Sequence, residues 1–351
     1  MTDSSLIDLT FRSNNISDTT KKNAKIVSFI NLKGGVGKTT LCLSIGEFLA
    51  FAMKKDVLII DLDSQSNLTS SIAHRNIIEL YKKKKCSIFH LFNDLLSEEP
   101  SFDAWNLEDA IVPPISCSNI KQNEHLSAIL SLPELGQFDE ALAEALEKCL
   151  KTDGIRSKNI KWKVDWRMIL KERLEPLRSK YDYILIDCPP SLSLFTSNAL
   201  VSSDYYLTPI SPEYLSIKGV DLIQDRLRGL RLRSGLDLQV KFLGCVVNRI
   251  DIRRNDHKDL CEKEIYKNMG IYKTFKYWVG DLKPMYLITD YSYPISKNGR
   301  NWNSIEEKYN IKDYEYTNPK KGILHINDEN EKYSMYERLY HLTNEFIGRC
   351  R

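Results

Sequence analysis

The hydrophobic positions of this chain fall into short apolar runs, separated by stretches in which apolar residues recur at helical spacing. The short runs predict buried strands, and the spaced positions, as at residues 41–53, predict helices. Strands that alternate with helices favour the α/β class, with a doubly wound, mostly parallel sheet and helices on both of its faces. The predicted strands span residues 25–31, 56–61, 183–187, 205–210 and 240–248.

Several segments do not follow this alternation. Residues 1–23 are rich in Ser, Asn, Asp and Thr, and we expect a flexible tail there because so polar a segment buries little surface. The remainder, residues 24–351, is expected to form a single domain. Within it, two stretches at about 76–180 and 297–328 are expected to be insertions, whose roles the sequence leaves open.

Residues 33–40, which read KGGVGKTT, carry the chemistry of a phosphate-binding loop. Their three glycines permit a tight turn whose backbone N–H groups point at phosphate oxygens, while Lys38 reaches the β- and γ-phosphates and the Thr39 hydroxyl ligates Mg²⁺. The strand before the loop and the helix after it add the positive end of a helix dipole. The expected nucleotide contacts here are Lys33, Gly34, Gly35, Val36, Gly37, Lys38, Thr39 and Thr40.

The loop, with a second lysine after Asn31 and Leu32, resembles the deviant Walker-A loop (P-loop) of the ParA/MinD family of ATPases. Residues 56–69 (DVLIIDLDSQSNLT) are similar to the second motif of that family, and residues 181–191 (YDYILIDCPPS) to its third. Segments at 197–200 and 208–214 resemble the ParA (Soj-like) partition branch. No recognition-helix module precedes the predicted core, so the resemblance is to members without an N-terminal DNA-recognition domain.

The resemblance assigns roles to charged residues around the loop. It implies that Asp63 orients the attacking water and that Asp187 contacts Mg²⁺ through water, next to the metal ligand Thr39. Lys38 and Lys33 neutralise phosphate charge, so Lys33, Lys38 and Asp63 are the expected catalytic residues. Family members use the lysine at the position of Lys33 to reach the partner's phosphates, which implies a homodimer with ATP sandwiched between its subunits.

Other positions are less regular. Asn248 matches the position at which relatives hydrogen-bond the adenine ring, although an Asn at a strand end also suits a plain turn. Ser64 and Ser66 stand where the second motif of the family has Pro and Gly, which loosens the loop after Asp63. We expect hydrolysis to be retained, with ATP and Mg²⁺ as cofactors.

Four arginines lie within eight acid-free positions of the helix expected after Glu213. The resemblance places Arg228 where relatives have a DNA-binding arginine and Arg253 near a second, and we add Arg231 and Arg254. Contacts of this kind to phosphates are independent of sequence and sensitive to salt. The alternative is that the charge run is the solvated face of a helix.

Composition adds limits. The 50 basic residues barely exceed the 47 acidic ones, so a basic surface has to be local. No apolar run approaches the roughly 20 residues that span a bilayer, and the first 22 residues contain no apolar core of a signal peptide, so we expect a cytoplasmic, nucleoid-associated protein. The eight cysteines are scattered, which indicates reduced thiols rather than a disulfide or metal framework.

The resulting hypothesis is a weak ATP hydrolase, stimulated by a partner and by DNA, whose ATP-bound dimer binds DNA non-specifically. It would drive partition of a plasmid, segregation of a chromosome or positioning of a protein cargo, through a ParB-like or other cargo adaptor. One alternative is a MinD-like membrane-associated ATPase, because residues 335–347 have the apolar spacing of an amphipathic helix. A lesser one is a bacterial tyrosine autokinase, suggested by Tyr309, Tyr314, Tyr316, Tyr333, Tyr336 and Tyr340.

Overall fold

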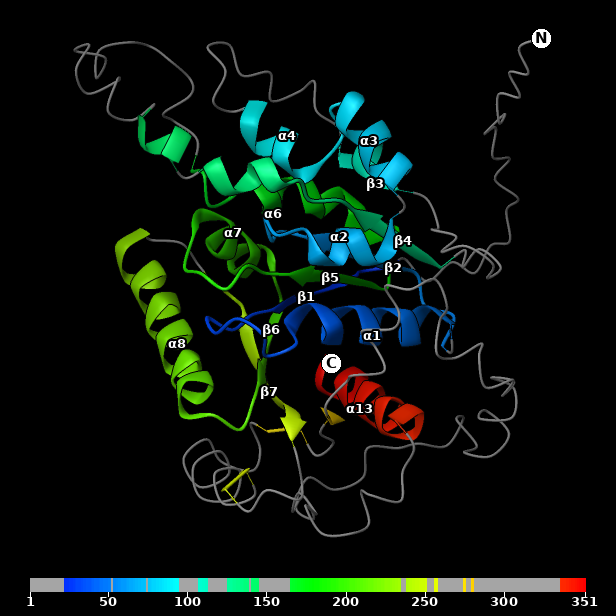
Figure 1. The fold of residues 1–351 in the computed structure, drawn as a ribbon, viewed down its shortest axis with the longest axis vertical. Helices are drawn as coiled ribbons and strands as arrows, with labels where there is room; N and C mark the ends of the chain where they lie inside the picture. Colours follow the sequence, from blue (N-terminus) through cyan, green and yellow to red (C-terminus); the bar gives the residue numbers. More distant parts are fainter. Residues whose placement is uncertain are drawn as a thin grey trace.

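The structure of the protein is a computed structural model, and an eight-stranded sheet forms the centre of the part that it describes (Figure 1). The residues described are 22–51, 53–73, 75–94, 107–112, 125–138, 140–144, 165–234, 238–250, 256–257, 274–275, 279–280 and 335–351. The strands are β1 (Lys25–Phe29), β2 (Val57–Asp61), β3 (Ile111–Val112), β4 (Leu126–Ile129), β5 (Tyr183–Asp187), β6 (Tyr205–Ile210), β7 (Lys241–Ile250) and β8 (Val279–Gly280).

The strand order is β3-β4-β2-β5-β1-β6-β7-β8, and every pairing is parallel except that of β3 with β4. This confirms the predicted doubly wound, mostly parallel sheet. The helices are α1 (Lys38–Phe51), α2 (Asn67–Ile72), α3 (Arg75–Lys83), α4 (Ile88–Asp94), α6 (Ile169–Leu174), α7 (Leu194–Ser202), α8 (Tyr214–Ser234) and α13 (Met335–Arg349), with shorter 3-10 turns at η1 (Leu107–Ala110), η2 (Pro133–Gln137) and η5 (Glu175–Ser179).

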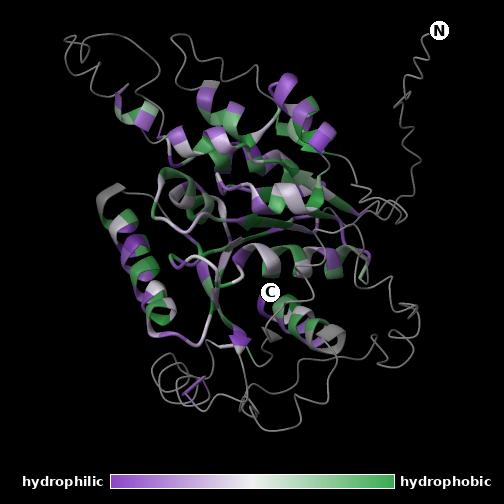
Figure 2. Ribbon diagram, viewed as in Figure 1, coloured by the Kyte–Doolittle hydropathy of each residue, from purple (hydrophilic) through white to green (hydrophobic). Residues whose placement is uncertain are grey.

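The two faces of the sheet bury separate hydrophobic clusters, because successive side chains of a strand point to opposite faces. In β2, Leu58 and Ile60 face the cluster that α4, α6, α7 and α8 complete, while Val57 and Ile59 face the cluster under α1, α2 and α13. Colouring by hydropathy shows the apolar strands between helices that turn polar residues outward (Figure 2). Strands buried on both faces read as continuous apolar runs, which is why the sequence pattern revealed them.

Some element boundaries differ from those predicted. Helix α1 begins at Lys38 rather than at residue 41, because its polar first turn belongs to the phosphate loop and lacks the apolar spacing. The stretch at 76–180 contributes strands β3 and β4, to which we assigned no strand; both are short. Residues 1–21 and the second expected insertion, at 297–328, lie outside the described residues.

Helix α13 packs its apolar face against the sheet. Phe346 is fully buried, stacks on Phe29 of β1 at 6.4 Å between ring centroids and lies 5.8 Å from the Tyr183 ring of β5. Leu342 is buried in the same cluster. Packing against the sheet therefore accounts for the amphipathic spacing of this helix.

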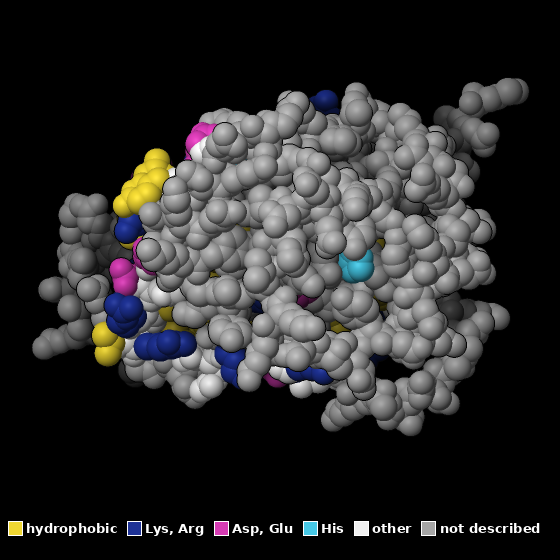
Figure 3. Space-filling model, turned by 90° about the horizontal axis from the view of Figure 1, so that it is seen from below, with side chains coloured by type: hydrophobic (Ala, Val, Ile, Leu, Met, Phe, Trp, Pro, Cys, Tyr) yellow, Lys and Arg dark blue, Asp and Glu magenta, His cyan; other side chains and the backbone are white. Residues whose placement is uncertain are grey.

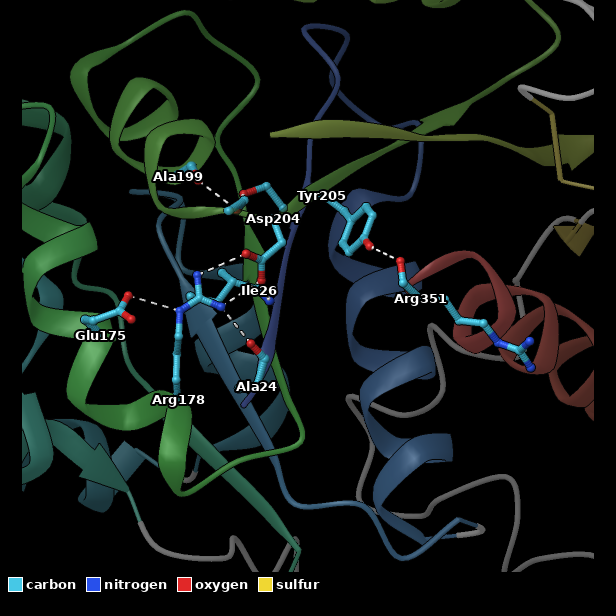
Figure 4. Close-up of polar contacts among 10 residues, drawn as sticks. Ala24, Ile26, Glu175, Arg178, Ala199, Asp204, Tyr205 and Arg351 are labelled. Atoms are coloured by element: carbon cyan, nitrogen blue, oxygen red, sulfur yellow. Dashed lines mark hydrogen bonds and ion pairs between the residues drawn. The ribbon is translucent and has the colours of Figure 1, made fainter. Parts of the chain in front are cut away.

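An ion-paired brace joins strands at the edge opposite to the phosphate loop (Figure 4). Arg178, on η5, donates from Nη1 to Asp204 Oδ2 at 2.8 Å and from Nη2 to Asp204 Oδ1 at 3.1 Å. Nη1 also donates to the Ala24 carbonyl at 2.7 Å, and the Ile26 N–H donates to Asp204 Oδ2 at 2.8 Å. The brace thus connects η5 to the amino ends of β1 and β6.

A second polar cluster lies at the same edge, before β2, β4 and β5. His125 Nδ1 lies 2.7 Å from Asp56 Oδ1, Lys22 pairs with the other oxygen, and the Asp56 N–H donates to Asp182 Oδ2 at 2.8 Å. Burial opposes ionisation of Asp56, but the hydrogen bonds from His125 and Lys22 outweigh it and hold the pKa of this carboxyl below its usual range. The amino edge of the sheet is therefore stabilised by paired charges.

Replacing Arg178 should destabilise the fold. The Arg178→Ala change leaves the Asp204 carboxylate and the Ala24 carbonyl without the guanidinium that donates to them. We therefore expect the free energy of unfolding in urea to fall by about 2 kcal/mol. Arg75→Ala is the matched control, since Arg75 forms an exposed i,i+4 pair with Glu79, and it should change stability by less than about 0.5 kcal/mol. Equal losses in both variants would contradict the structural role of the brace.

Candidate nucleotide-binding site

The phosphate loop connects β1 to α1 at the carboxyl edge of the sheet, where doubly wound folds place ligands. Gly35 and Gly37 have φ angles of 75° and 87°, in the left-handed region that favours glycine. The Lys33 N–H donates to Asn31 Oδ1 at 3.0 Å, and Lys38 Nζ donates back to the Lys33 carbonyl at 3.3 Å. The loop is therefore closed by its own side chains around a glycine-rich turn.

Gly37 lies against the side chain of Asn248, at the end of β7. A Cβ atom at Gly37 would lie 2.0 Å from Asn248 Nδ2, so no other residue fits here without a shift. Asn248 Nδ2 donates to the Val36 carbonyl at 2.9 Å, and its Oδ1 accepts from the Arg249 N–H at 2.9 Å. Both polar atoms of the Asn248 side chain are thus engaged within the protein, and its contact with adenine stays a prediction.

Asp187 and Asp61 are register partners on β5 and β2, and both are fully buried. Burial, and then the neighbouring Asp61 charge, raise the pKa of Asp187 well above its usual range, while the Thr39 hydroxyl and Lys38 oppose that shift. The Thr39 hydroxyl lies close enough to Asp187 to lower the pKa of this carboxyl, yet neither Asp187 oxygen has a well-formed hydrogen bond among the described residues. A buried carboxylate with open oxygens beside a threonine hydroxyl is a donor set that fits hydrated Mg²⁺.

Lys38 is 6% exposed and lies among these carboxylates. Burial lowers the pKa of its ammonium, and the charges of Asp187 and Asp63 oppose that shift. The predicted residues Lys38, Thr39, Asp63 and Asp187 therefore come together around the loop. Since this cluster combines a cation, a hydroxyl and carboxylates below a glycine-rich cradle, it can receive a polyphosphate with its metal ion.

Asp61 anchors the loop that carries Asp63. Its Oδ2 accepts from the Thr69 N–H at 2.9 Å and from the Thr69 hydroxyl at 2.8 Å, and its Oδ1 accepts from the Asp63 N–H at 3.0 Å. Burial raises the pKa of Asp61 to about 6, although these hydrogen bonds favour the charged form. Asp63 is 7% exposed, and its Oδ1 accepts from the Gln65 N–H at 3.0 Å.

Ser66 ends this loop in a strained conformation. Its φ of 52° lies in the left-handed region, which suits the Gly that the family has at this position better than a serine. The substitution that we noted from the sequence therefore keeps the backbone conformation expected of glycine.

The Lys33 ammonium pairs with Glu213, the residue before α8. The hydrogen bond from Lys33 is the main reason that the pKa of Glu213 lies below its usual range, and the Arg249 charge adds to it. The Lys33 side chain is 25% exposed, at the outer edge of the phosphate loop. The two lysines of the loop thus occupy different surroundings: Lys38 faces the interior and Lys33 faces the surface.

The structure places further residues at the site: Asp61, Glu213 and Arg249. Asp61 was visible as the first acid of its motif, and Glu213 lay in a segment that we compared with the family. Arg249 had no sequence signal, because its contact with the Gly35 carbonyl depends on backbone placement.

Three arginines of α8 have individual partners. Arg226 donates to Ser197 Oγ at 3.0 Å, and Arg231 reaches the Val240 carbonyl at 3.4 Å. Arg228 is exposed and pairs with Asp225 at 3.0 Å. Arg253 and Arg254, the other predicted DNA contacts, lie outside the described residues. Arg228 and Arg231 therefore remain the exposed candidates on the described part of this surface.

The sheet, the loop and the acids at its carboxyl edge define a P-loop nucleotide-binding protein. A sequence profile of the AAA domain family matches residues 24–240, and the chain belongs to this family, within the ParA-like partition ATPases. Soj of Bacillus subtilis, named a sporulation initiation inhibitor protein, is 29% identical over 251 residues, 71% of this chain and 83% of its own. ParA of Myxococcus xanthus, a chromosome partitioning protein, is 27% identical over 66% of this chain and 67% of its own.

Solved structures share the fold. A plasmid partition protein from Borrelia burgdorferi bound to AMPPNP aligns with a TM-score of 0.54 and 24% identity, over 83% of this chain and 100% of that chain. A variant of McdA from Cyanothece in complex with ATP aligns with a TM-score of 0.57 and 19% identity, over 82% of this chain and 96% of its own. These likenesses confirm the expected P-loop architecture.

A methyl group at Gly37 should disrupt the loop. Because Gly37→Ala combines a φ of 87° with an overlap on Asn248, we expect the free energy of unfolding in urea to fall by about 2 kcal/mol and binding of fluorescent ATP to be lost. Gly34→Ala is the control for stability, since its Cβ would meet nothing within 4 Å, and it should stay within about 0.5 kcal/mol of wild type. Equal stability of the two variants would show that the Asn248 contact does not constrain the loop.

Proposed function

We propose that this protein is an ATP-dependent dimerising ATPase that binds DNA non-specifically and drives partition or positioning of a plasmid, chromosome or protein cargo. The observation that carries the proposal is the pair of lysines on one phosphate loop, with Lys38 buried among carboxylates and Lys33 at the surface. A single buried lysine suffices to hold a nucleotide. A second one at the surface suits a contact with the nucleotide of another subunit.

ATP and Mg²⁺ fit the site described above. Thr39 and the open carboxylate of Asp187 would hold the ion through direct and water-mediated contacts, and the ion would neutralise charge on the phosphates. Lys38 would bind the β- and γ-phosphates. Loop N–H groups would cradle the same phosphates, since Gly35 and Gly37 turn the backbone inward.

Asp63 is the candidate for orienting the attacking water. Its position is fixed from several sides, because its N–H donates to Asp61 and Ser131 Oγ donates to its carbonyl at 2.8 Å. A carboxylate held in this way can accept a hydrogen bond from water without reorganising during the reaction. Hydrolysis would be slow until an adaptor of the ParB kind and DNA complete the active arrangement.

Dimerisation is supported by the surface of α8, which follows Glu213. Four of the six exposed large hydrophobic residues in the described part of the chain lie on this helix: Tyr214, Leu215, Leu222 and Leu232. Hydrophobic, basic and acidic side chains lie next to one another at the end of the molecule where α8 runs (Figure 3). Exposed apolar groups of this density suit a protein contact. Lys33 would leave Glu213 to reach the partner's phosphates.

DNA binding is proposed for the arginines at 228, 231, 253 and 254. The Arg228–Asp225 pair is exposed, with side-chain exposures of 69% and 62%, so it contributes little stability and a DNA phosphate can replace it. Such contacts would place the ATP-bound dimer on the nucleoid. The acids Asp221 and Asp225 on the same helix keep its surface from being uniformly basic, and the solvated-face interpretation of α8 stays open to test.

Neither alternative function gains support. A MinD-like helix would lie on the membrane surface and not cross it, and the apolar face of α13 is buried against β1 and β5. The membrane proposal depended on that face. Separately, no helix among the described residues is long and apolar enough to cross a bilayer. The side chains of the tyrosines that suggested an autokinase lie outside the described residues.

Removing the surface lysine should prevent dimerisation. We expect Lys33→Ala to bind ATP but to form dimers at least about tenfold more weakly in analytical ultracentrifugation with ATP and Mg²⁺, because the cross-subunit charge contact is lost. Lys83→Ala, on exposed α3, controls for loss of a surface charge. Normal ATP-dependent dimerisation of Lys33→Ala would overturn the cross-subunit role.

DNA binding gives the direct test of the proposed function. Fluorescence anisotropy of a random-sequence duplex with ATP, ADP or no nucleotide should give tight binding with ATP alone, weakened by salt. Arg228→Ala should lower the slope of log affinity against log salt by about one per contacted phosphate, and Arg75→Ala should leave it unchanged. Equal binding in all three nucleotide states would contradict the proposed switch.

A further inference from the structure

Strand β7 ends in an irregularity at Arg249. Its pairing with β8 shifts register between Asn248 and Ile250, and Arg249 has a φ of 59°, in the left-handed region. A non-glycine residue is strained there, and such strain persists only where surrounding contacts hold it. Bulges of this kind redirect side chains next to functional sites.

The irregularity changes where two neighbouring side chains point. In a regular strand, consecutive side chains point to opposite faces of the sheet. Here the side chains of Asn248 and Arg249 both reach the phosphate loop. Asn248 Nδ2 donates to the carbonyl of Val36 at 2.9 Å, and Arg249 Nη1 donates to the carbonyl of Gly35 at 2.7 Å.

These bonds orient two consecutive peptide groups of the loop. No described peptide bond is cis, and in a trans peptide the carbonyl and the following N–H point in opposite directions. Holding the Gly35 carbonyl therefore directs the Val36 N–H to the other side, and holding the Val36 carbonyl does the same for the Gly37 N–H. These are N–H groups of the proposed phosphate cradle.

We propose that Arg249 is a positioning residue for the phosphate loop: its bond to the Gly35 carbonyl, made possible by the bulge at the end of β7, holds the cradle in the conformation that receives phosphates. This inference rests on the proposed binding of ATP at the loop. Arg249 is an exposed residue, and its bond to the Gly35 carbonyl distinguishes it from an arginine that contacts only solvent. The side chain acts through the loop, not on the phosphates.

Arg249→Gly is the decisive variant, because it removes the guanidinium while glycine accepts the φ of 59° without strain. In the full-length, nucleotide-free protein, we expect it to bind fluorescent ATP with Mg²⁺ about tenfold more weakly, the cost of one lost charged hydrogen bond. The affinity for inorganic tripolyphosphate, measured by competition, should fall by the same factor, because the lost bond orients the N–H groups that bind phosphates. The melting temperature without nucleotide should not fall.

Two further variants complete the test. Arg249→Lys retains a charged donor and should recover most of the affinity for both probes, whereas Arg75→Ala, which removes an exposed arginine far along the chain, should bind as wild type does. Unchanged affinity in Arg249→Gly overturns the positioning role. So does a loss that follows a lower melting temperature and that Arg249→Lys does not recover, since the role would then be structural. Failure of the wild type to bind either probe would overturn the proposed function itself, and this inference with it.

Discussion

The parallel, in-register pairing of β1, β5 and β2 is the constraint on which the candidate site depends. Phe29 of β1 and Asp61 of β2 are both register partners of Asp187, so three strands end at one level. The phosphate loop leaves the first of them and the Asp63 loop leaves the third. A slip of one residue would turn every side chain to the opposite face and remove the acids from the loop. The hydrophobic core therefore sets the geometry of the chemistry.

Much of this arrangement could be predicted because buried parallel strands and the phosphate loop leave strong local patterns. Strands β5 and β6 were predicted to the residue. Lys38, Thr39, Asp63 and Asp187 lie near one another in the structure, and their roles stay predictions. Strand β4, at Leu126–Ile129, was not predicted because it has only four residues, one of them a serine, and so leaves a weak apolar pattern. Local pattern identifies an element best when the element is long and buried.

Contacts between side chains and distant main-chain atoms could not be predicted in this way. Arg249 reaches Gly35 across 214 positions of sequence, and Arg226 of α8 reaches Ser197 of α7. The arginines of α8 looked alike as a run of charge, yet Arg226, Arg228 and Arg231 have different surroundings in the fold. Such partners are set by the backbone path of a bulge or by the packing of two helices, neither of which has a sequence period.

The two edges of the sheet differ in how completely their charged groups are paired. At the amino edge, Arg178 and Asp204 satisfy each other and neighbouring backbone groups. At the carboxyl edge, neither oxygen of the buried Asp187 has a hydrogen bond among the described residues, and the Lys38 charge opposes only part of the cost of burying its charge. The charges at the amino ends of these strands are therefore paired, whereas the negative charge at their carboxyl ends is only partly neutralised. A bound cation would consequently stabilise the fold as well as take part in the chemistry. The free energy of unfolding would then rise with the fraction of the protein that has the cation bound.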